Sequence, residues 1–481
     1  MAPQKTTNNN PSEVVTMNHS PGAAPPRSHR VVIFSTIVAA LGGLLFGFDT
    51  AVISGTTGAL EREFELSSNG LGFTVAIALI GTVIGALSVG KPADWLGRKR
   101  SLMVIAVMYF ISAVGSALAT VWGEFLVYRL IGGLAVGAAS VVAPMYIAEI
   151  SPAAMRGRLV AINQLNVVGG ILLAFLSNYV IGLSIDDATA WRWMLGIEAV
   201  PAALFLALLF LIPYSPRWLV KKGRILEAHD VLVKMGEPNV EQELADIERS
   251  LKDDDNGASD RLFQRKYMFP IFCAWAIAMF NQLSGINALM YYAPRIFESA
   301  GFSTEASLLQ AVLVGGTNFM FTVIALFMID KLGRRPLLFI GSIGTAASLF
   351  LVSFQFMAEE ISGSLVLYGL LGFIAAFAIS QGAVIWVFIS EIFPNRVRAK
   401  GQAFGSFTHW FMAAAVSWLF PVFADGNGGL VFIFFGLMMV LQFLFVWKIM
   451  PETKGTSLED LEYTLHVRDT KPGTPEAATS A

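Results

Sequence analysis

The chain has 481 residues, of which 55% are hydrophobic and 14% charged, and this balance excludes an ordinary soluble globular protein of that length. A formal net charge of −2 excludes the basic surface of a nucleic-acid-binding protein, and a single cysteine, Cys273, excludes an intrachain disulfide. We therefore expect a protein that resides in a lipid bilayer and has no nucleic-acid partner.

Long apolar stretches follow a polar N-terminal tail, residues 1–30, for which the composition predicts disorder and no signal peptide. A helix needs about 20 mostly apolar residues to cross a bilayer. Twelve stretches meet this requirement: 31–56, 70–91, 101–119, 122–148, 158–181, 192–212, 267–292, 306–329, 336–357, 364–390, 402–423 and 430–449. The sequence therefore predicts an all-α membrane protein with twelve transmembrane helices.

Two charged sequence motifs occur once in each half of the chain, in the same order. The charged turn at Asp94–Arg98 is repeated at Asp330–Arg334, and the motif at Glu149–Arg156 is repeated at Glu391–Arg398. Such a repeat is typical of a transporter built from two parallel bundles. We expect a six-helix bundle over 31–213, a helical linker over 214–266, a second six-helix bundle over 267–450 and a C-terminal tail over 451–481.

Lysine and arginine in the loops predict the orientation, because they gather on the cytoplasmic side. One set of loops contains Lys91, Arg98, Lys99, Arg100, Arg156, Arg158, Lys331, Arg334, Arg335, Arg396, Arg398 and Lys400, whereas the opposite set has only Arg62, Arg192 and Arg295. Both termini and the 214–266 linker are therefore predicted to be cytoplasmic. Within that linker, Val240, Leu244, Ile247 and Leu251 form one apolar stripe. The stripe favours a surface helix packed under the bundle over a regulatory docking site.

Three ionisable residues lie inside predicted spans: Asp49 in the first, Arg129 in the fourth and Glu198 in the sixth. Charged side chains at a helix centre cost at least about 2.5–3.5 kcal/mol, so such residues are functional candidates. One arginine neutralises two carboxylates only in part, which leaves one carboxylate able to take up a proton. The alternative is a fixed ion network that holds the bundle together.

The second half of the chain has amides and aromatics in its spans instead of charges. Gln282, Asn287 and Tyr291 lie within about one helical face of the seventh span. Further polar or aromatic groups in other spans are Gln164, Asn318, Trp386, His409 and Trp410. Amides beside aromatic surfaces suit a neutral polyhydroxylated ligand, although interhelical hydrogen bonds would explain any one of them.

The sequence lacks the residues that metal binding and ATP-driven pumping need. His409 is the one histidine within a span, and no second metal-ligating residue lies at the right spacing, so no metal site is expected. No glycine-rich phosphate loop with its lysine is present, so ATP-driven pumping has no support. We expect neither a cofactor nor an enzyme activity.

From about residue 31 to residue 460, the chain resembles the sugar porters of the major facilitator superfamily. The resemblance rests on the two charged turns, on Pro144 through Glu149, on Gln282 with Gly285-Ile286-Asn287, and on Pro451-Glu452-Thr453-Lys454-Gly455. It implies twelve helices in two six-helix bundles, with cytoplasmic helices and a central hexose or pentose site reached alternately from either side of the membrane.

The resemblance also implies roles for individual residues. The implied sugar-binding residues are Gln164, Asn281, Gln282, Asn287, Tyr291, Asn318 and Trp386, together with His409 and Trp410, which replace an amide beside tryptophan. Asp49 falls where proton-coupled members keep an aspartate, with Arg129 and Glu198 as its buried partners. The implied cytoplasmic salt-bridge lattice, which locks the outward-open state, comprises Asp94, Arg98, Glu149, Arg156, Arg217, Asp330, Arg334, Glu391 and Arg398.

Three departures from the family pattern bear on these expectations. Asn281 replaces the commoner glutamine, and Tyr214 replaces the usual acidic residue before Ser215-Pro216-Arg217. The tenth span has Gly382 through Trp386 where the family has prolines, which predicts a less sharply bent helix.

The resulting hypothesis is a monomeric plasma-membrane symporter that imports a monosaccharide, glucose or a related hexose, together with a proton. One alternative is a facilitator without proton coupling. A second is a membrane sugar sensor that binds without transporting; tails of about 30 residues are short for a signalling protein of this family.

Overall fold

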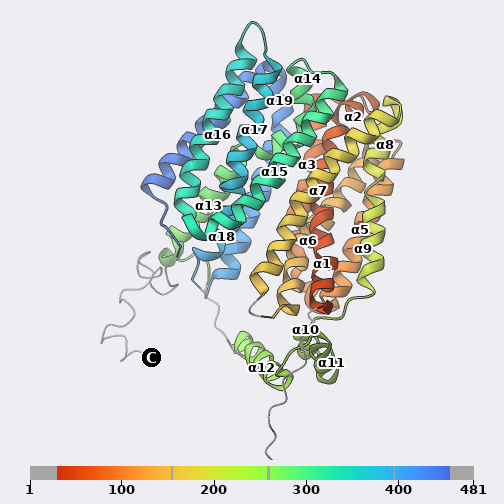
Figure 1. Ribbon diagram of the computed structural model, residues 1–481, viewed down its shortest axis with the longest axis vertical. Coiled ribbons are helices and arrows are strands. Elements are labelled where there is room, and N and C mark those ends of the chain that lie inside the picture. The colour runs from red at the N-terminus through yellow and green to blue at the C-terminus, as the bar shows by residue number, and fades with distance from the viewer. Residues whose placement is uncertain (1–29, 153–154, 257–260, 395, 455–481) are drawn as a thin grey trace, which may run out of the picture.

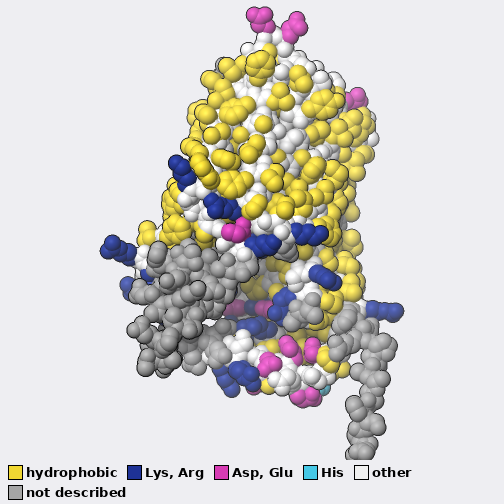
Figure 2. All heavy atoms as spheres, turned by 60° about the vertical axis from the view of Figure 1, so that its left-hand side comes forward, with side chains coloured by type: hydrophobic (Ala, Val, Ile, Leu, Met, Phe, Trp, Pro, Cys, Tyr) yellow, Lys and Arg dark blue, Asp and Glu magenta, His cyan; other side chains and the backbone are white. Residues whose placement is uncertain are grey.

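The computed structural model describes residues 30–454 except 153–154, 257–260 and 395, and leaves out the side chains of 187, 253–256, 330 and 426–427 (Figure 1). Within the described part, every regular element is a helix, and twelve helical segments are long and apolar enough to cross a membrane. The predicted fold class is therefore confirmed. Figure 2 shows hydrophobic side chains covering the body of the molecule, with lysines and arginines gathered below them.

The N-terminal half contains the first six spans. Its elements are α1 (Arg30–Val52), η1 (Ile53–Gly55), α2 (Thr57–Glu63), α3 (Ser68–Ser88), α4 (Gly90–Leu96), α5 (Arg98–Leu118), α6 (Trp122–Ile150), α7 (Arg156–Ser184), α8 (Asp187–Gly196) and α9 (Ala199–Leu209). In this half α1 packs on α7, α3 packs on α6, and α5 packs on α6 and α9.

The C-terminal half contains the other six. Its elements are η2 (Arg265–Tyr267), α13 (Met268–Leu283), α14 (Ile286–Ser299), α15 (Thr304–Leu332), α16 (Arg334–Met357), α17 (Gly363–Ile379), α18 (Gln381–Glu391) and α19 (Arg398–Lys448), which supplies the last two spans. Here α19 packs on α13 and α16, and α16 packs on α17. The halves meet where α3 contacts α19 and α7 contacts α15.

Glycine allows close helix contacts within the first half. A Cβ atom added at Gly133 of α6 would lie 1.9 Å from the carbonyl oxygen of Ala78 in α3. Only a residue without a side chain permits this approach, and such small residues let membrane helices pack closely.

Short helices α10 (Pro216–Lys221), α11 (Ile225–Met235) and α12 (Val240–Asn256) lie together at one end of the bundle (Figure 1). We call this end the linker end and the opposite end, where α2, α8 and α14 lie, the far end. Leu244, Ile247 and Leu251 of α12 pack against the cluster around Trp218 and Leu219 of α10. The apolar stripe therefore belongs to a packed surface helix, but the helices it packs against are α10 and α11 of the linker.

Two spans are broken rather than merely curved. The seventh ends its first part at Leu283 and restarts at Ile286, because Gly285 adopts a left-handed conformation with φ of 83°. The tenth breaks at Ser380, whose φ and ψ of −118° and −89° are not helical. The tenth span is thus interrupted at a serine, two residues before Gly382, without a proline. A bend less sharp than that of the family stays a prediction.

Candidate functional site

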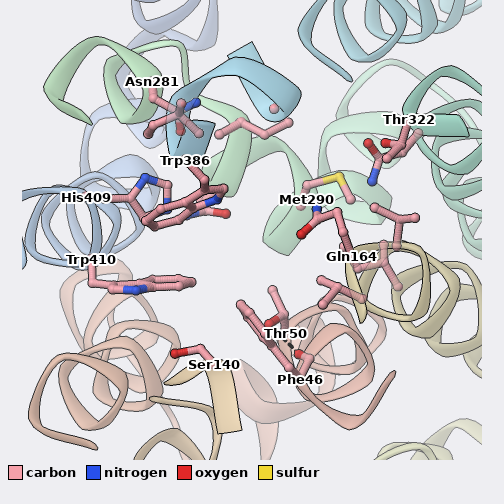
Figure 3. Close-up of a pocket in the computed structure, with 18 of the residues that line it drawn as sticks. Phe46, Thr50, Ser140, Gln164, Asn281, Met290, Thr322, Trp386, His409 and Trp410 are labelled. Atoms are coloured by element: carbon pink, nitrogen blue, oxygen red, sulfur yellow. Dashed lines mark hydrogen bonds between the residues drawn. The ribbon is translucent and has the colours of Figure 1, made fainter. Parts of the chain in front are cut away.

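A cavity of about 450 Å³ lies between the two halves. Figure 3 shows its walls: Phe46, Thr50, Ser140 and Gln164 come from the first half, and Asn281, Met290, Thr322, Trp386, His409 and Trp410 come from the second. A small-molecule pocket of this size between two domains is a typical binding site.

Most of the residues predicted to contact the ligand line this cavity. They are Gln164, Asn281, Gln282, Asn287, Asn318, Trp386, His409 and Trp410. Tyr291 is different: it is 4% exposed and does not line the cavity, although it lies four residues, about one helical turn, after Asn287 of the cavity wall.

The amides in the seventh span are hydrogen-bonded to one another. Asn287 Nδ2 donates to Gln282 Oε1 at 2.8 Å, and Gln282 Nε2 donates to Asn281 Oδ1 at 3.0 Å. Gln282 Nε2 also lies 3.3 Å from the ring nitrogens of His409. A hydroxylated ligand that enters the cavity can exchange these bonds for its own without leaving an amide unpaired.

Aromatic rings form the other part of the wall. The ring centroids of Trp386 and His409 are 4.8 Å apart, those of His409 and Trp410 are also 4.8 Å apart, and Phe46 lies 5.6 Å from Trp410 across the boundary between the halves. Such flat apolar faces complement the C–H face of a sugar ring while the amides address its hydroxyls.

Several lining residues escaped the sequence analysis: Phe46, Ser140, Asn163, Met290 and Thr322. Two of them had a detectable signal. Thr322 lies four residues after Asn318, on the same helical face, and Asn163 precedes Gln164 and has a buried side-chain oxygen without a partner among the described residues. The other three are ordinary residues of apolar helices, and only the fold places them at the cavity.

The three ionisable residues of the first half meet in the interior. Arg129 Nη1 lies 2.7 Å from Asp49 Oδ1, and Asp49, Arg129 and Glu198 are 2%, 3% and 1% exposed. Glu198 Oε1 has no hydrogen-bond partner in the described part of the chain. Asp49 therefore does not face lipid. Among the described residues Arg129 forms an ion pair with Asp49 alone, and Glu198 is a second carboxylate shielded from water. With two buried carboxylates and one arginine, charge balance favours one bound proton.

The charged turns at the linker end form one ion cluster in each half. In the first, Arg98 pairs with Asp94 at 2.9 Å and with Glu149 at 2.8 Å. In the second, Arg334 pairs with Glu391 at 2.7 Å. Each of these pairs lies within one half, so Glu149 has a partner that does not come from the other half.

The other predicted lattice residues have different contacts. Arg156 donates to the carbonyls of Ala148 and Ser151, Arg217 donates to Ser250 Oγ, and Arg398 donates to the carbonyl of Phe393. The side chain of Asp330 lies outside the described part of the structure.

The halves are joined by polar contacts at the far end. Arg295 of α14 pairs with Glu61 of α2 at 2.6 Å, Trp418 Nε1 donates to Asn69 Oδ1 at 2.9 Å, and Ser68 donates to Asp425. Among described residues, no hydrogen bond or ion pair at the linker end crosses between the halves. The molecule is therefore closed at the far end.

Comparison with known proteins decides the family. A family model described as Sugar (and other) transporter matches residues 35–465. The chain belongs to this sugar transporter family. It is 42% identical to the D-xylose-proton symporter of Escherichia coli strain K12, over 89% of this chain and 95% of the relative. It is 38% identical to the arabinose-proton symporter of Bacillus subtilis, over 92% of this chain and 97% of the relative.

Solved structures point the same way. The inward open conformation of the xylose transporter XylE from E. coli matches with a TM-score of 0.80 at 40% identity, over 90% of this chain and 99% of that one. The XylE structure bound to 6-bromo-6-deoxy-D-glucose matches with a TM-score of 0.74, over 91% of this chain. This sugar transporter is thus a multi-pass membrane carrier rather than an enzyme, and its far-end closure agrees with the likeness to an inward open structure.

Proposed function

We propose that this protein imports a monosaccharide together with a proton by alternating access, with the bundles over 31–213 and 267–450 as its two moving halves. The linker end is cytoplasmic in this proposal, because the loops there carry most of the lysine and arginine. The observation that carries the proposal is the buried Asp49 and Arg129 pair beside an amide-lined cavity. Relatives that transport xylose or arabinose with protons support it.

The coupling follows from charge balance. A proton on Asp49 removes its charge, so that Asp49 no longer holds Arg129, and the protonated site tolerates burial as the halves close over the sugar. With the far end closed, Asp49 has its guanidinium partner at 2.7 Å, as expected after the proton has left. Tyr291 is buried on the seventh span, one helical turn after Asn287 of the cavity wall, so it is the residue we assign to link sugar and proton.

In the cavity, the amides of Gln164, Asn281, Gln282, Asn287 and Asn318 are the proposed partners of sugar hydroxyls. Trp386, His409 and Trp410 are the proposed ring contacts. Arg98 and Arg334 hold the charged turns at the linker end, where Glu149 and Glu391 must exchange partners when that end closes.

Two kinds of observation bear on whether the substrate is a pentose or a hexose. The Gln282-Leu283-Ser284 triplet resembles hexose carriers and favours D-glucose. The relatives named above transport D-xylose or arabinose, and a further relative is named a glucose transport protein. Competition by a panel of hexoses and pentoses against labelled D-glucose and labelled D-xylose distinguishes them. D-glucose as substrate is refuted if it neither enters nor competes with D-xylose.

Proton coupling is tested by concentrative uptake in proteoliposomes of the full chain. A membrane potential supplies about 2.3 kcal/mol per charge per 100 mV, enough for roughly fiftyfold accumulation of a sugar that enters with one proton. We expect accumulation with an inward proton gradient and its loss when a protonophore is added. Uptake that only equilibrates the sugar, with or without the gradient, would favour the uncoupled facilitator.

A further inference from the structure

Three cationic side chains surround one aromatic ring at the linker end. Lys99 Nζ lies 5.2 Å from the ring centroid of Tyr214, Arg224 Cζ lies 5.5 Å from it and Arg100 Cζ lies 5.8 Å from it. Tyr214 in turn stacks on Trp218 with 5.7 Å between the ring centroids. Each cation gains a modest attraction to the ring face, but three like charges around one ring also repel one another.

Carboxylates do not balance this cluster. Arg224 pairs with Glu227 at 2.5 Å, and within the described residues no carboxylate lies at ion-pair distance from Lys99 or Arg100. Position 214 itself is a neutral tyrosine and adds no negative charge to offset the cations. The cluster around Tyr214 therefore has an excess of positive charge, which favours an anionic ligand.

The place of the cluster indicates where such an anion comes from. Lys99 and Arg100 are in the first turn of α5, at the end of a membrane span, and Lys99 Nζ donates to the carbonyls of Phe210 and Ile212 at 3.1 and 2.7 Å. The side chains of Phe210 and Leu211, which follow α9, are 65% and 68% exposed, and Val104 of α5 is 49% exposed. An apolar surface for acyl chains thus begins directly beside the cations.

We infer that this cluster binds the phosphate of an anionic membrane phospholipid, whose acyl chains lie along α5 and α9. Arg100, which is exposed, and Lys99 face the phosphate, and Tyr214 holds them in place. Juxtamembrane lysines and arginines attract anionic lipids in this way. The site is separate from the sugar cavity and does not depend on the substrate or on proton coupling.

The lipid site also has a structural link to the gate. Tyr214 stacks on Trp218, and Trp218 Nε1 donates at 3.1 Å to the carbonyl of Asp94, the residue that pairs with Arg98. A phosphate bound at the cluster therefore restrains the charged turn of the first half. The described part of the second half has no ring with three cations around it: Lys448 is the one cation over Trp447, at 5.6 Å from the ring centroid, and Arg335 contacts the carbonyl of Trp447 instead of its ring.

Native mass spectrometry of the purified full chain tests the inference, with phosphatidylglycerol and phosphatidylcholine titrated in parallel. We expect Arg100→Gln to weaken the first phosphatidylglycerol bound by about fivefold, the effect of one cation near a membrane surface, and Tyr214→Glu to weaken it further. The matched control Lys448→Gln should leave this first lipid unchanged, as should all variants with phosphatidylcholine. Unchanged thermal unfolding verifies that the variants fold.

Two results would overturn the assignment. One is equal loss of phosphatidylglycerol in Arg100→Gln and Lys448→Gln, which would mean that lipids respond to overall charge only. The other is full displacement of the lipid by millimolar inorganic phosphate, which would make the cluster a site for free phosphate.

Discussion

The ion pair between Glu61 and Arg295 closes the far end, so its removal should open that end. Arg295 Nη1 lies 2.6 Å from Glu61 Oε2, the other Nη lies 3.5 Å from Oε1, and the two side chains are 30% and 32% exposed. Exposed pairs contribute about 0.2–1 kcal/mol, and the two-pronged geometry places this one near the upper value. Glu61→Gln should therefore shift the ratio of far-end-closed to far-end-open molecules by about fivefold.

Labelling of one introduced cysteine measures this shift. Thr57 of α2 is 2% exposed, so Thr57→Cys in a Cys273→Ser background reports opening of the far end to a membrane-impermeant maleimide. The matched control is Glu63→Gln, which removes a 3.1 Å pair with Arg192 inside the first half. The labelling rate should rise with Glu61→Gln and stay unchanged with Glu63→Gln. It should return to the wild-type level when Arg295→Glu is combined with Glu61→Arg, because this exchange restores an ion pair. Equal labelling of wild type and Glu61→Gln would refute the reasoning.

Three further changes test other parts of the structure. Gln282→Ala should raise the sugar concentration for half-maximal uptake by about tenfold, because it removes the amide at the centre of the network; an unchanged value would exclude Gln282 from sugar binding. Gly285→Ala should cost about 1–3 kcal/mol of stability, because φ is 83° and its Cβ would lie 2.5 Å from the Phe435 ring; Gly316→Ala, with open space around it, is the control in thermal unfolding. Burial opposes the charge of Glu452, but bonds from the backbone N–H groups of Lys454, Arg335, Arg334 and Thr453 outweigh it and lower its pKa below 4.5. The ionised Glu452 therefore stabilises the fold at pH values above its ordinary pKa, and this stabilisation is lost as the pH falls through the lowered, folded-state pKa. Glu452→Gln should reduce the unfolding temperature at pH 7, and the reduction should become smaller below pH 4.5. A constant effect across that range would contradict the role of its charge.

Much of the fold follows from local composition. Each predicted span needed only a long apolar stretch, and the twelve segments of the structure fall on the predicted ones. The breaks were harder to predict, because Ser380 carries no sequence signal for a bend and depends on its contact with the neighbouring helix. A Cβ at Gly341 of α16 would lie 1.7 Å from Ser380 Oγ, so the two residues approach each other only in the folded helix pair.

In the candidate site, too, some residues were predictable from the sequence and others were not. Asp49, Arg129 and Glu198 were predicted because ionisable residues in apolar spans are conspicuous, and the structure brings them together. The partners of Glu149 were not predictable, because partner choice depends on which end of the carrier is open. Phe46 and Ser140 reach the cavity only through the packing of the halves, which periodicity does not encode.

Sugar movement by the Asp49→Asn variant tests coupling most directly, because the change removes the ionisable group and keeps the shape of a side chain that is 2% exposed. Proteoliposomes report two quantities: accumulation of labelled sugar against a gradient, and exchange of labelled for unlabelled sugar. Coupling through Asp49 predicts that the variant exchanges sugar but no longer accumulates it. A variant that still concentrates sugar in response to a proton gradient would show that the proton travels by another route.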